Sequence, residues 1–386
     1  MATGRATAAQ LLLTGYLPHV LRRRFLQTSA AVASAAAAAC RPQGSAAADA
    51  APAVRTDRRF EWIMVTTWPP GFPILQEACV RLAERVREMS AGQLDIKVYG
   101  SGELVPAFEC FEAVSLGTAA IASGASYYWA GKVPEAQFFS SVPFGLNAQG
   151  MNAWIDHAGG LELWREAYAP FNIRPYPAGN TGVQMAGWFN RELEDLSSFD
   201  GLKMRIPGLG GKVFDRAGGT TLLSPGTELY TNLERGVLDA TEWIGPYHDF
   251  LMGFHEVAPY YYGPGWHEPG TVLEVIVHQP TYETLPRHLQ RVLDAAIAEA
   301  NAWTLHAFEA NNGAYLARIL DYGTDVRTLP TPLLNALRPL AEEVVAELAA
   351  SNALATRIHD SYAAFAKTYG TWADLSEGAY QRVLRR

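Results

Sequence analysis

Short strand-like runs alternate with helix-like runs early in the chain, and this order constrains the fold more than any other feature. Residues 60–65, 94–99 and 119–123 have the apolar or small side chains of buried strands. Between them, residues 73–89 and 107–116 repeat apolar side chains at helical spacing. This alternation predicts a βαβαβ unit, and an open α/β sheet binds ligands beyond the carboxyl ends of its strands.

The second half of the chain predicts further strands and then long helices. Four strands are expected, at 183–189, 202–206, 237–244 and 271–277. The first two begin a second lobe, and the last would return to the first lobe. Long helical patterns follow at 286–322 and 332–368.

The N-terminus has the features of an export signal. The run Arg22-Arg23-Arg24-Phe25-Leu26 precedes a weakly apolar stretch. This order predicts a Tat-type signal peptide and linker within residues 1–48, and hence the periplasm. The apolar run is too short to span a bilayer. Alternatively, Ala37-Ala38-Ala39-Cys40 is a degenerate lipobox, which would attach a lipid anchor at Cys40.

Charge and cysteine content narrow the class of partner. Residues 1–48 hold five arginines and no acid, so the remaining chain carries a net charge of −13 against −8 for the whole. Such acidity argues against nucleic acid and predicts that a small anion needs a local positive group. Cys79 and Cys110 are either one disulfide or, as the helical pattern favours, two buried apolar side chains.

One arginine stands in an otherwise apolar strand and is the candidate positive group. Lys203 and Arg205 share one strand face, and Arg205 lies near the point where Pro207 breaks the ladder. A guanidinium in that place can donate two hydrogen bonds to a carboxylate. A structural ion pair is the alternative interpretation.

Several motifs occur in a fixed order around this strand. They are 179–185, 201–205, 211–213, 233–236, 239–243 and 258–266. Together they resemble the solute-binding proteins of TRAP transporters, in particular the branch that binds α-keto acids. The resemblance runs from about Phe60 to the final helix. It implies a non-enzymatic receptor with a two-lobed, periplasmic-binding-protein-like α/β fold, crossing hinge segments and a long C-terminal helical extension.

The resemblance also implies a division of the chain. Lobe 1 would comprise 57–182 and 269–308, and lobe 2 would comprise 183–268 and 309–340. Residues 341–386 would form the C-terminal extension, which in this branch is exchanged between the subunits of a homodimer. A helix packed on its own lobe is the alternative.

Four residues are candidates for the solute site, and the resemblance implies the first of them. Arg205 would anchor the carboxylate, and Gln184 would supply a second polar contact. Asn180 is a further donor, with a turn-forming role as the alternative. Tyr128 follows a strand end and would line the site, with packing under a loop as the alternative.

The branch also binds a cation between protein and solute, sodium first and calcium as the alternative. The implied ligands are the side chains of Glu242, Glu268 and Gln184 and the backbone carbonyl of Trp243. A cation would turn two repelling carboxylates into an attractive site for an anion. Without the resemblance, Glu242 would be interpreted as a solvated or salt-bridged acid.

The chain departs from the family pattern near these ligands. His267 stands where the branch has a second tryptophan, Pro269 stands where it has glycine, and Pro207 stiffens the loop after Arg205. These departures affect the identity of the solute. A pyruvate-like 2-oxo monocarboxylate, delivered to a TRAP membrane permease, is the leading prediction; lactate, a C4-dicarboxylate or a sugar acid are the alternatives.

Two enzyme interpretations compete with a receptor. Three His-acid pairs, at His248, His255 and His267, could suggest a zinc hydrolase, but none has HExxH spacing. Glu242 and Glu268 could instead act as paired carboxylates in a secreted hydrolase. No nucleophile motif accompanies them.

Overall fold

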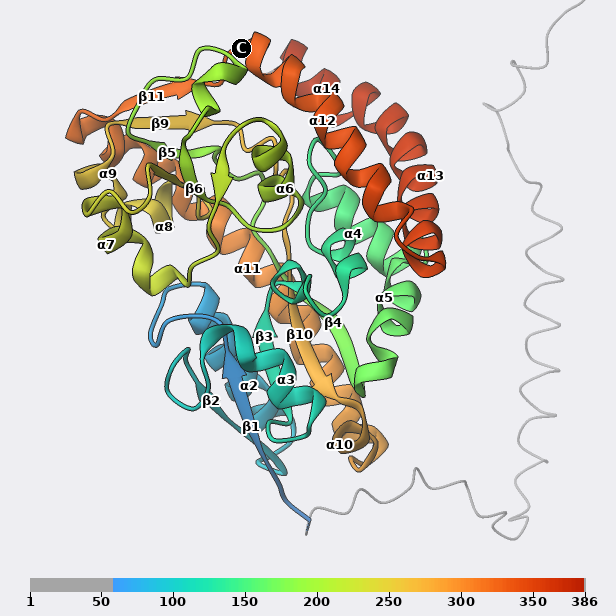
Figure 1. The fold of residues 1–386 in the computed structure, drawn as a ribbon. Helices are drawn as coiled ribbons and strands as arrows, with labels where there is room; N and C mark the ends of the chain where they lie inside the picture. The colour runs from blue at the N-terminus through green and yellow to red at the C-terminus, as the bar shows by residue number, and fades with distance from the viewer. Residues whose placement is uncertain (1–57, 385–386) are drawn as a thin grey trace, which may run out of the picture. The chain divides into compact units, whose positions relative to one another are not determined.

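The computed structural model describes residues 58–384, in which one sheet has five strands in the order β2-β1-β3-β10-β4 (Figure 1). The strands are β1 Phe60–Thr66, β2 Leu94–Tyr99, β3 Ile121–Gly124, β10 Val272–His278 and β4 Ile173–Asn180. β1 is parallel to β2 and β3, and β10 is antiparallel to β3 and β4. Helices α2 (Leu75–Met89) and α3 (Cys110–Ser115) connect the first three strands, which confirms the predicted βαβαβ unit.

The second sheet has six strands in the order β11-β9-β5-β8-β6-β7. They are β11 Asp325–Thr328, β9 Tyr260–Gly263, β5 Gly187–Phe189, β8 Ala240–Thr241, β6 Lys203–Arg205 and β7 Thr220–Thr221. The strands predicted at 183–189, 202–206 and 237–244 are therefore longer than the observed β5, β6 and β8. Residues beside these short strands make isolated backbone bonds instead, such as Met185 N–H to the Ile244 carbonyl at 3.0 Å.

Strand β4 has no counterpart among the predicted strands. It contains Pro175, Pro177 and Gly179, residues that usually argue against a strand. Within residues 58–384, β4 pairs only with β10 and forms the edge of its sheet. An edge strand tolerates proline, because an N–H that would face away from the sheet has no strand to bond. The sequence pattern alone does not reveal that edge position.

The chain crosses between the two sheets three times: from β4 to β5, from β9 to β10, and through helix α11 to β11. Helix α11 (Arg287–Tyr322) has 36 residues, which corresponds to about 54 Å at 1.5 Å per residue. It contacts α2 and β4 as well as α8 (Pro246–Leu251) beside the second sheet. The predicted two-lobed α/β fold with crossing segments is confirmed.

The predicted single helix at 332–368 is wrong, because two helices occupy this region. Helix α12 spans Thr331–Ala349 and helix α13 spans Ala353–Leu375. The side chain of Asn352 caps α13 by accepting from Ala355 N–H at 2.8 Å, so the chain starts a new helix there. Helix α13 packs on α4 (Ala148–His157) and α5 (Gly160–Tyr168), as Figure 1 shows in red and green.

Two further sequence predictions can be compared with the structure. Cys79 and Cys110 are free and buried, so the apolar interpretation is confirmed and the disulfide is absent. The Tat signal, the linker and Cys40 lie outside the described residues. No helix within 58–384 combines the length and the apolar character that a bilayer crossing requires.

Strand β10 lies between β3 and β4 in the interior of its sheet and carries one acid, Glu274. Glu274 is 0% exposed. Its carboxylate accepts hydrogen bonds from Trp129 Nε1–H and, at 3.1 Å, from the Tyr168 hydroxyl. Burial raises the pKa of Glu274 to about 8, although both hydrogen bonds lower it. The folded protein therefore holds a proton that the unfolded chain releases.

Replacing Glu274 by Gln should flatten the pH dependence of stability. Between the ordinary pKa of 4.5 and about 8, the folded state binds a proton that the unfolded state has lost. Stability of the wild type should therefore fall with rising pH in this window, by at most about 1.4 kcal/mol per pH unit from this group. Urea unfolding at pH 5.5 and 7.5 measures the effect. Equal slopes in the wild type, Glu274→Gln and the surface control Glu84→Gln would contradict it.

Candidate functional site

Arg205 is the last residue of strand β6 and is 1% exposed. β6 pairs with β8 so that Arg205 lies opposite Thr241. The guanidinium donates through Nη1 to the Glu242 carboxylate and through Nε to the Ser224 carbonyl at 3.4 Å. Lys203, two residues earlier, is exposed. Arg205 therefore sits at the predicted strand end, and its main partner within the chain is an acid.

Glu242 directly follows β8, and its two carboxylate oxygens have different surroundings. Oε1 accepts from Arg205, whereas Oε2 has no hydrogen-bond partner among the described residues and lies 3.5 Å from His267 Nε2. Burial lowers the pKa of Arg205, but Glu242 and the neighbouring Tyr128 and Tyr127 raise it, so it lies above its ordinary value. The guanidinium stays charged and neutralises one carboxylate.

Gln184 and Glu268 lie on two of the crossing segments and join them. Gln184 Nε2 donates to Glu268 Oε2 at 2.6 Å, and the Gln184 backbone N–H donates to the Glu268 carbonyl at 3.2 Å. The Thr271 hydroxyl donates to the same carboxylate oxygen at 2.6 Å. Burial, followed by the charge of Glu242, raises the pKa of Glu268 to about 7, although His267 lowers it. A second buried acid thus stands without a cationic partner of its own.

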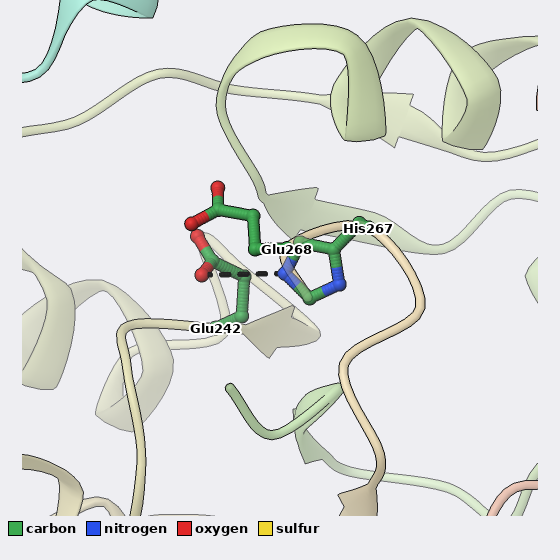
Figure 2. A group of neighbouring side chains, drawn as sticks. All are labelled: Glu242, His267 and Glu268. Carbon is green, nitrogen blue, oxygen red and sulfur yellow. Dashed lines mark ion pairs between the residues drawn. The ribbon is translucent and has the colours of Figure 1, made fainter. Parts of the chain in front are cut away.

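Figure 2 shows Glu242, His267 and Glu268 as neighbours. One ligand atom from each of the three lies within 4.8 Å of the others, and within residues 58–384 this is the one such His, Cys, Asp or Glu group. Gln184 Oε1 and Glu242 Oε2 are buried oxygens to which no residue of 58–384 donates a hydrogen bond. Oxygen donors suit a hard cation such as Na⁺ or Ca²⁺, so the residues present fit the predicted ion.

Aromatic side chains cover the guanidinium. Tyr127 and Tyr128 lie on the short turn η2 (Ser126–Trp129), which follows β3 of the five-stranded sheet. The Tyr128 hydroxyl accepts from Arg205 Nη2 at 3.4 Å, and the Trp243 ring centre lies 5.2 Å from the guanidinium carbon. Because Tyr128 and Arg205 come from different sheets, the site lies between the two sheets.

Asn180 behaves differently from the other predicted residues. Its Oδ1 accepts from Gly182 N–H at 2.9 Å and its Nδ2 donates to the Gly270 carbonyl at 3.5 Å. These bonds fix the backbone of the crossing segments and correspond to the turn-forming alternative. Thr181 and Thr271, which hold Gln184 and Glu268, are absent from the predictions. A hydroxyl that orients another side chain has no signature in a single sequence.

The three His-acid pairs do not converge on one zinc site. His248 Nε2 bonds to the Pro73 carbonyl at 2.9 Å, and burial lowers the pKa of His248 to about 3. His255 stacks on Phe250 with ring centres 4.3 Å apart. Only His267 belongs to the group of Figure 2.

Arg205→Met should lower the free energy of unfolding by about 3–5 kcal/mol, because Glu242 would remain buried without its counter-ion. The double variant Arg205→Met/Glu242→Gln should recover most of that loss. Chemical denaturation in chelator-treated buffer measures both. A single variant as stable as the wild type would show that the pair does not hold the site together.

Comparison with known proteins shows which family the chain resembles. The family model "Bacterial extracellular solute-binding protein, family 7" (DctP) matches residues 64–352. A monocarboxylate 2-oxoacid-binding periplasmic protein of Nostoc sp. is 39% identical over 362 residues, which cover 93% of this chain and 98% of that protein.

Two solved structures of TRAP periplasmic solute-binding proteins are similar along most of the chain. The protein from Colwellia psychrerythraea, with bound calcium and pyruvate, is 39% identical, with a TM-score of 0.82. The match covers 84% of this chain and 99% of that chain. The protein from Pseudoalteromonas atlantica, with bound sodium and pyruvate, is 38% identical, with a TM-score of 0.82 and the same coverage.

Proposed function

This chain belongs to the DctP family of bacterial extracellular solute-binding proteins, and we propose that it is the receptor that supplies a TRAP permease with a small 2-oxo monocarboxylate, bound together with a cation. The family consists of transport receptors and not enzymes. One observation carries the proposal: Arg205, Glu242, Glu268 and Gln184 meet in one buried group that leaves acceptor oxygens unpartnered. The similar proteins that bind pyruvate support it.

The charges of the group support a bound cation. Two buried carboxylates, Glu242 and Glu268, face one guanidinium. A cation on Gln184 Oε1 and the two carboxylates would balance the excess charge and present a positive centre to an incoming anion. The Trp243 backbone carbonyl is a further predicted ligand. Sodium is the ion proposed first and calcium is the alternative; similar proteins with each of these ions bound are known.

The anion itself would bind to Arg205. Among residues 58–384, the guanidinium Nη2 donates only to the Tyr128 hydroxyl, at 3.4 Å, so it can also donate to the carboxylate of a bound anion. Pyruvate is the proposed solute, with longer 2-oxo acids, lactate, C4-dicarboxylates and sugar acids as alternatives. A hydrolase built on Glu242 and Glu268 is not proposed, because the chain belongs to a family of transport receptors.

We also propose where the protein is located and which residues form its two lobes. Tat export to the periplasm, with a lipid on Cys40 as the alternative, agrees with the extracytoplasmic role of the family. The proposed lobes are 57–182 with 269–308 and 183–268 with 309–340. All five strands of the first sheet fall in the first set, and all six of the second fall in the other.

Ligand-induced stabilisation tests the proposed solute class. Ligand-stripped protein should gain about 2.7 kcal/mol at 100 times the dissociation constant of a 2-oxo acid, provided that a cation is present. Thermal unfolding with pyruvate, longer 2-oxo acids, lactate and succinate, with and without sodium or calcium, measures this gain. A shift with succinate alone would contradict the solute class, and a shift independent of added cation would contradict the cation.

We also propose a homodimer formed through residues 341–386. The first half of α13 buries Ile358 and Tyr362 within the chain, whereas the end of the C-terminal region exposes large apolar side chains. They are Trp372, Leu375, Tyr380, Val383 and Leu384, each at least 53% exposed. Such a cluster on one terminal segment favours a second subunit as its partner.

Trp372→Asp/Leu375→Asp should convert this dimer to a monomer, because two charges would replace apolar contact surface. Light scattering after size-exclusion chromatography measures the mass. Leu116→Asp, which changes a leucine that is 70% exposed on α3's C-terminal side, is the matched control and should leave the dimer intact. A monomeric wild type would contradict the proposed dimer.

A further inference from the structure

The His267 imidazole is buried with both ring nitrogens lacking a hydrogen-bond partner among residues 58–384. Its side chain is 0% exposed. A neutral imidazole has one donor and one acceptor, and burying either without a partner is unfavourable. The ring therefore marks a place where a molecule outside the chain completes the hydrogen bonding.

The chain holds this ring in a fixed position. Gly210, in the first turn of α6 (Gly208–Arg216), packs so closely that a Cβ there would lie 2.7 Å from the His267 Cβ. On the other side, Trp266 packs its ring edge-on, with ring centres 5.5 Å apart. The Phe144 N–H donates to the Trp266 carbonyl at 2.7 Å and fixes the backbone. These contacts hold the His267 ring in place beside Glu242.

The two nitrogens of the His267 ring have different surroundings. Nε2 faces the Glu242 carboxylate at 3.5 Å, and Nδ1 lies on the other side of the ring (Figure 2). Glu242 Oε1 accepts a hydrogen bond from Arg205, and Glu242 Oε2 faces His267 Nε2. Arg205 and His267 therefore lie on the two sides of one carboxylate. A small anion whose carboxylate binds Arg205 would thus present its next oxygen, the one on C2, to His267.

We propose that His267 Nε2–H donates a hydrogen bond to the C2 oxygen of the bound acid and so determines specificity for carboxylic acids that carry an oxygen on C2. This inference rests on the proposed function. It assigns the oxygen atoms of the site to the cation and the N–H groups to the anion. The unpartnered oxygens of Gln184 and Glu242 serve the cation. The N–H groups of Arg205 and His267 serve the two ends of the anion.

A matched pair of variants tests the assignment. His267→Gln places an amide N–H near the position of Nε2, whereas His267→Asn reaches only the position of Nδ1. His267→Gln should retain most of the affinity for pyruvate. His267→Asn and His267→Phe should weaken it by about tenfold to a hundredfold, the effect of losing one hydrogen bond to an anionic solute. Isothermal titration calorimetry with pyruvate in excess calcium measures these affinities.

Two measurements separate this contact from a structural or cation-binding role. Each ligand-free variant should keep a cooperative thermal unfolding transition, and its calcium affinity without pyruvate should match the wild type. Wild-type pyruvate affinity in both His267→Asn and His267→Phe would overturn the inference. An equal loss of calcium affinity without pyruvate would also overturn it, since His267 would then be a cation ligand. A wild type that binds calcium but no 2-oxo acid would instead overturn the proposed function.

Discussion

Two buried carboxylates and a single guanidinium, which pairs with one of them, set the requirements of this site. A buried carboxylate is strongly unfavourable unless an opposite charge or several donors compensate it. Arg205 compensates Glu242 through a direct ion pair. Glu268 has hydrogen bonds from Gln184 and Thr271 but no cation of its own, and its pKa rises to about 7. At neutral pH, an added cation would best balance the charges of Glu242, Glu268 and Arg205. Binding of the cation would then be coupled to binding of the anion.

The fold explains why these groups meet. Arg205 and Glu242 belong to the six-stranded sheet, and Tyr128 follows a strand of the five-stranded sheet. Gln184 and Glu268 lie on the segments that cross between the sheets and bond to each other there. A hinge motion of the two lobes would therefore separate Tyr128 from Arg205 while the crossing segments keep Gln184 beside Glu268. Binding and closure would then depend on the same few contacts.

The sequence predicts the β1-to-β3 unit because alternating apolar patterns are local properties. It does not predict β4, whose prolines are tolerated only because the strand lies at a sheet edge, nor the break at Asn352. At the site, Arg205, Gln184, Glu242 and Glu268 are implied by the family resemblance, and the structure brings these four side chains together. Thr181 and Thr271 each bond a residue three positions away, Gln184 and Glu268. What joins the two pairs is the contact of Gln184 with Glu268 and Thr271, 84 and 87 residues along the chain, which no local pattern encodes.

The coupling between cation and solute is the central claim, and thermodynamic reciprocity gives its most direct test. The measurement is the calcium affinity of ligand-stripped wild-type protein, by isothermal titration calorimetry, with and without saturating pyruvate. If the cation bridges the two carboxylates and the anion, pyruvate should tighten calcium binding by about tenfold or more, within the usual range of coupling energies. A calcium affinity that is the same with and without pyruvate would contradict the account.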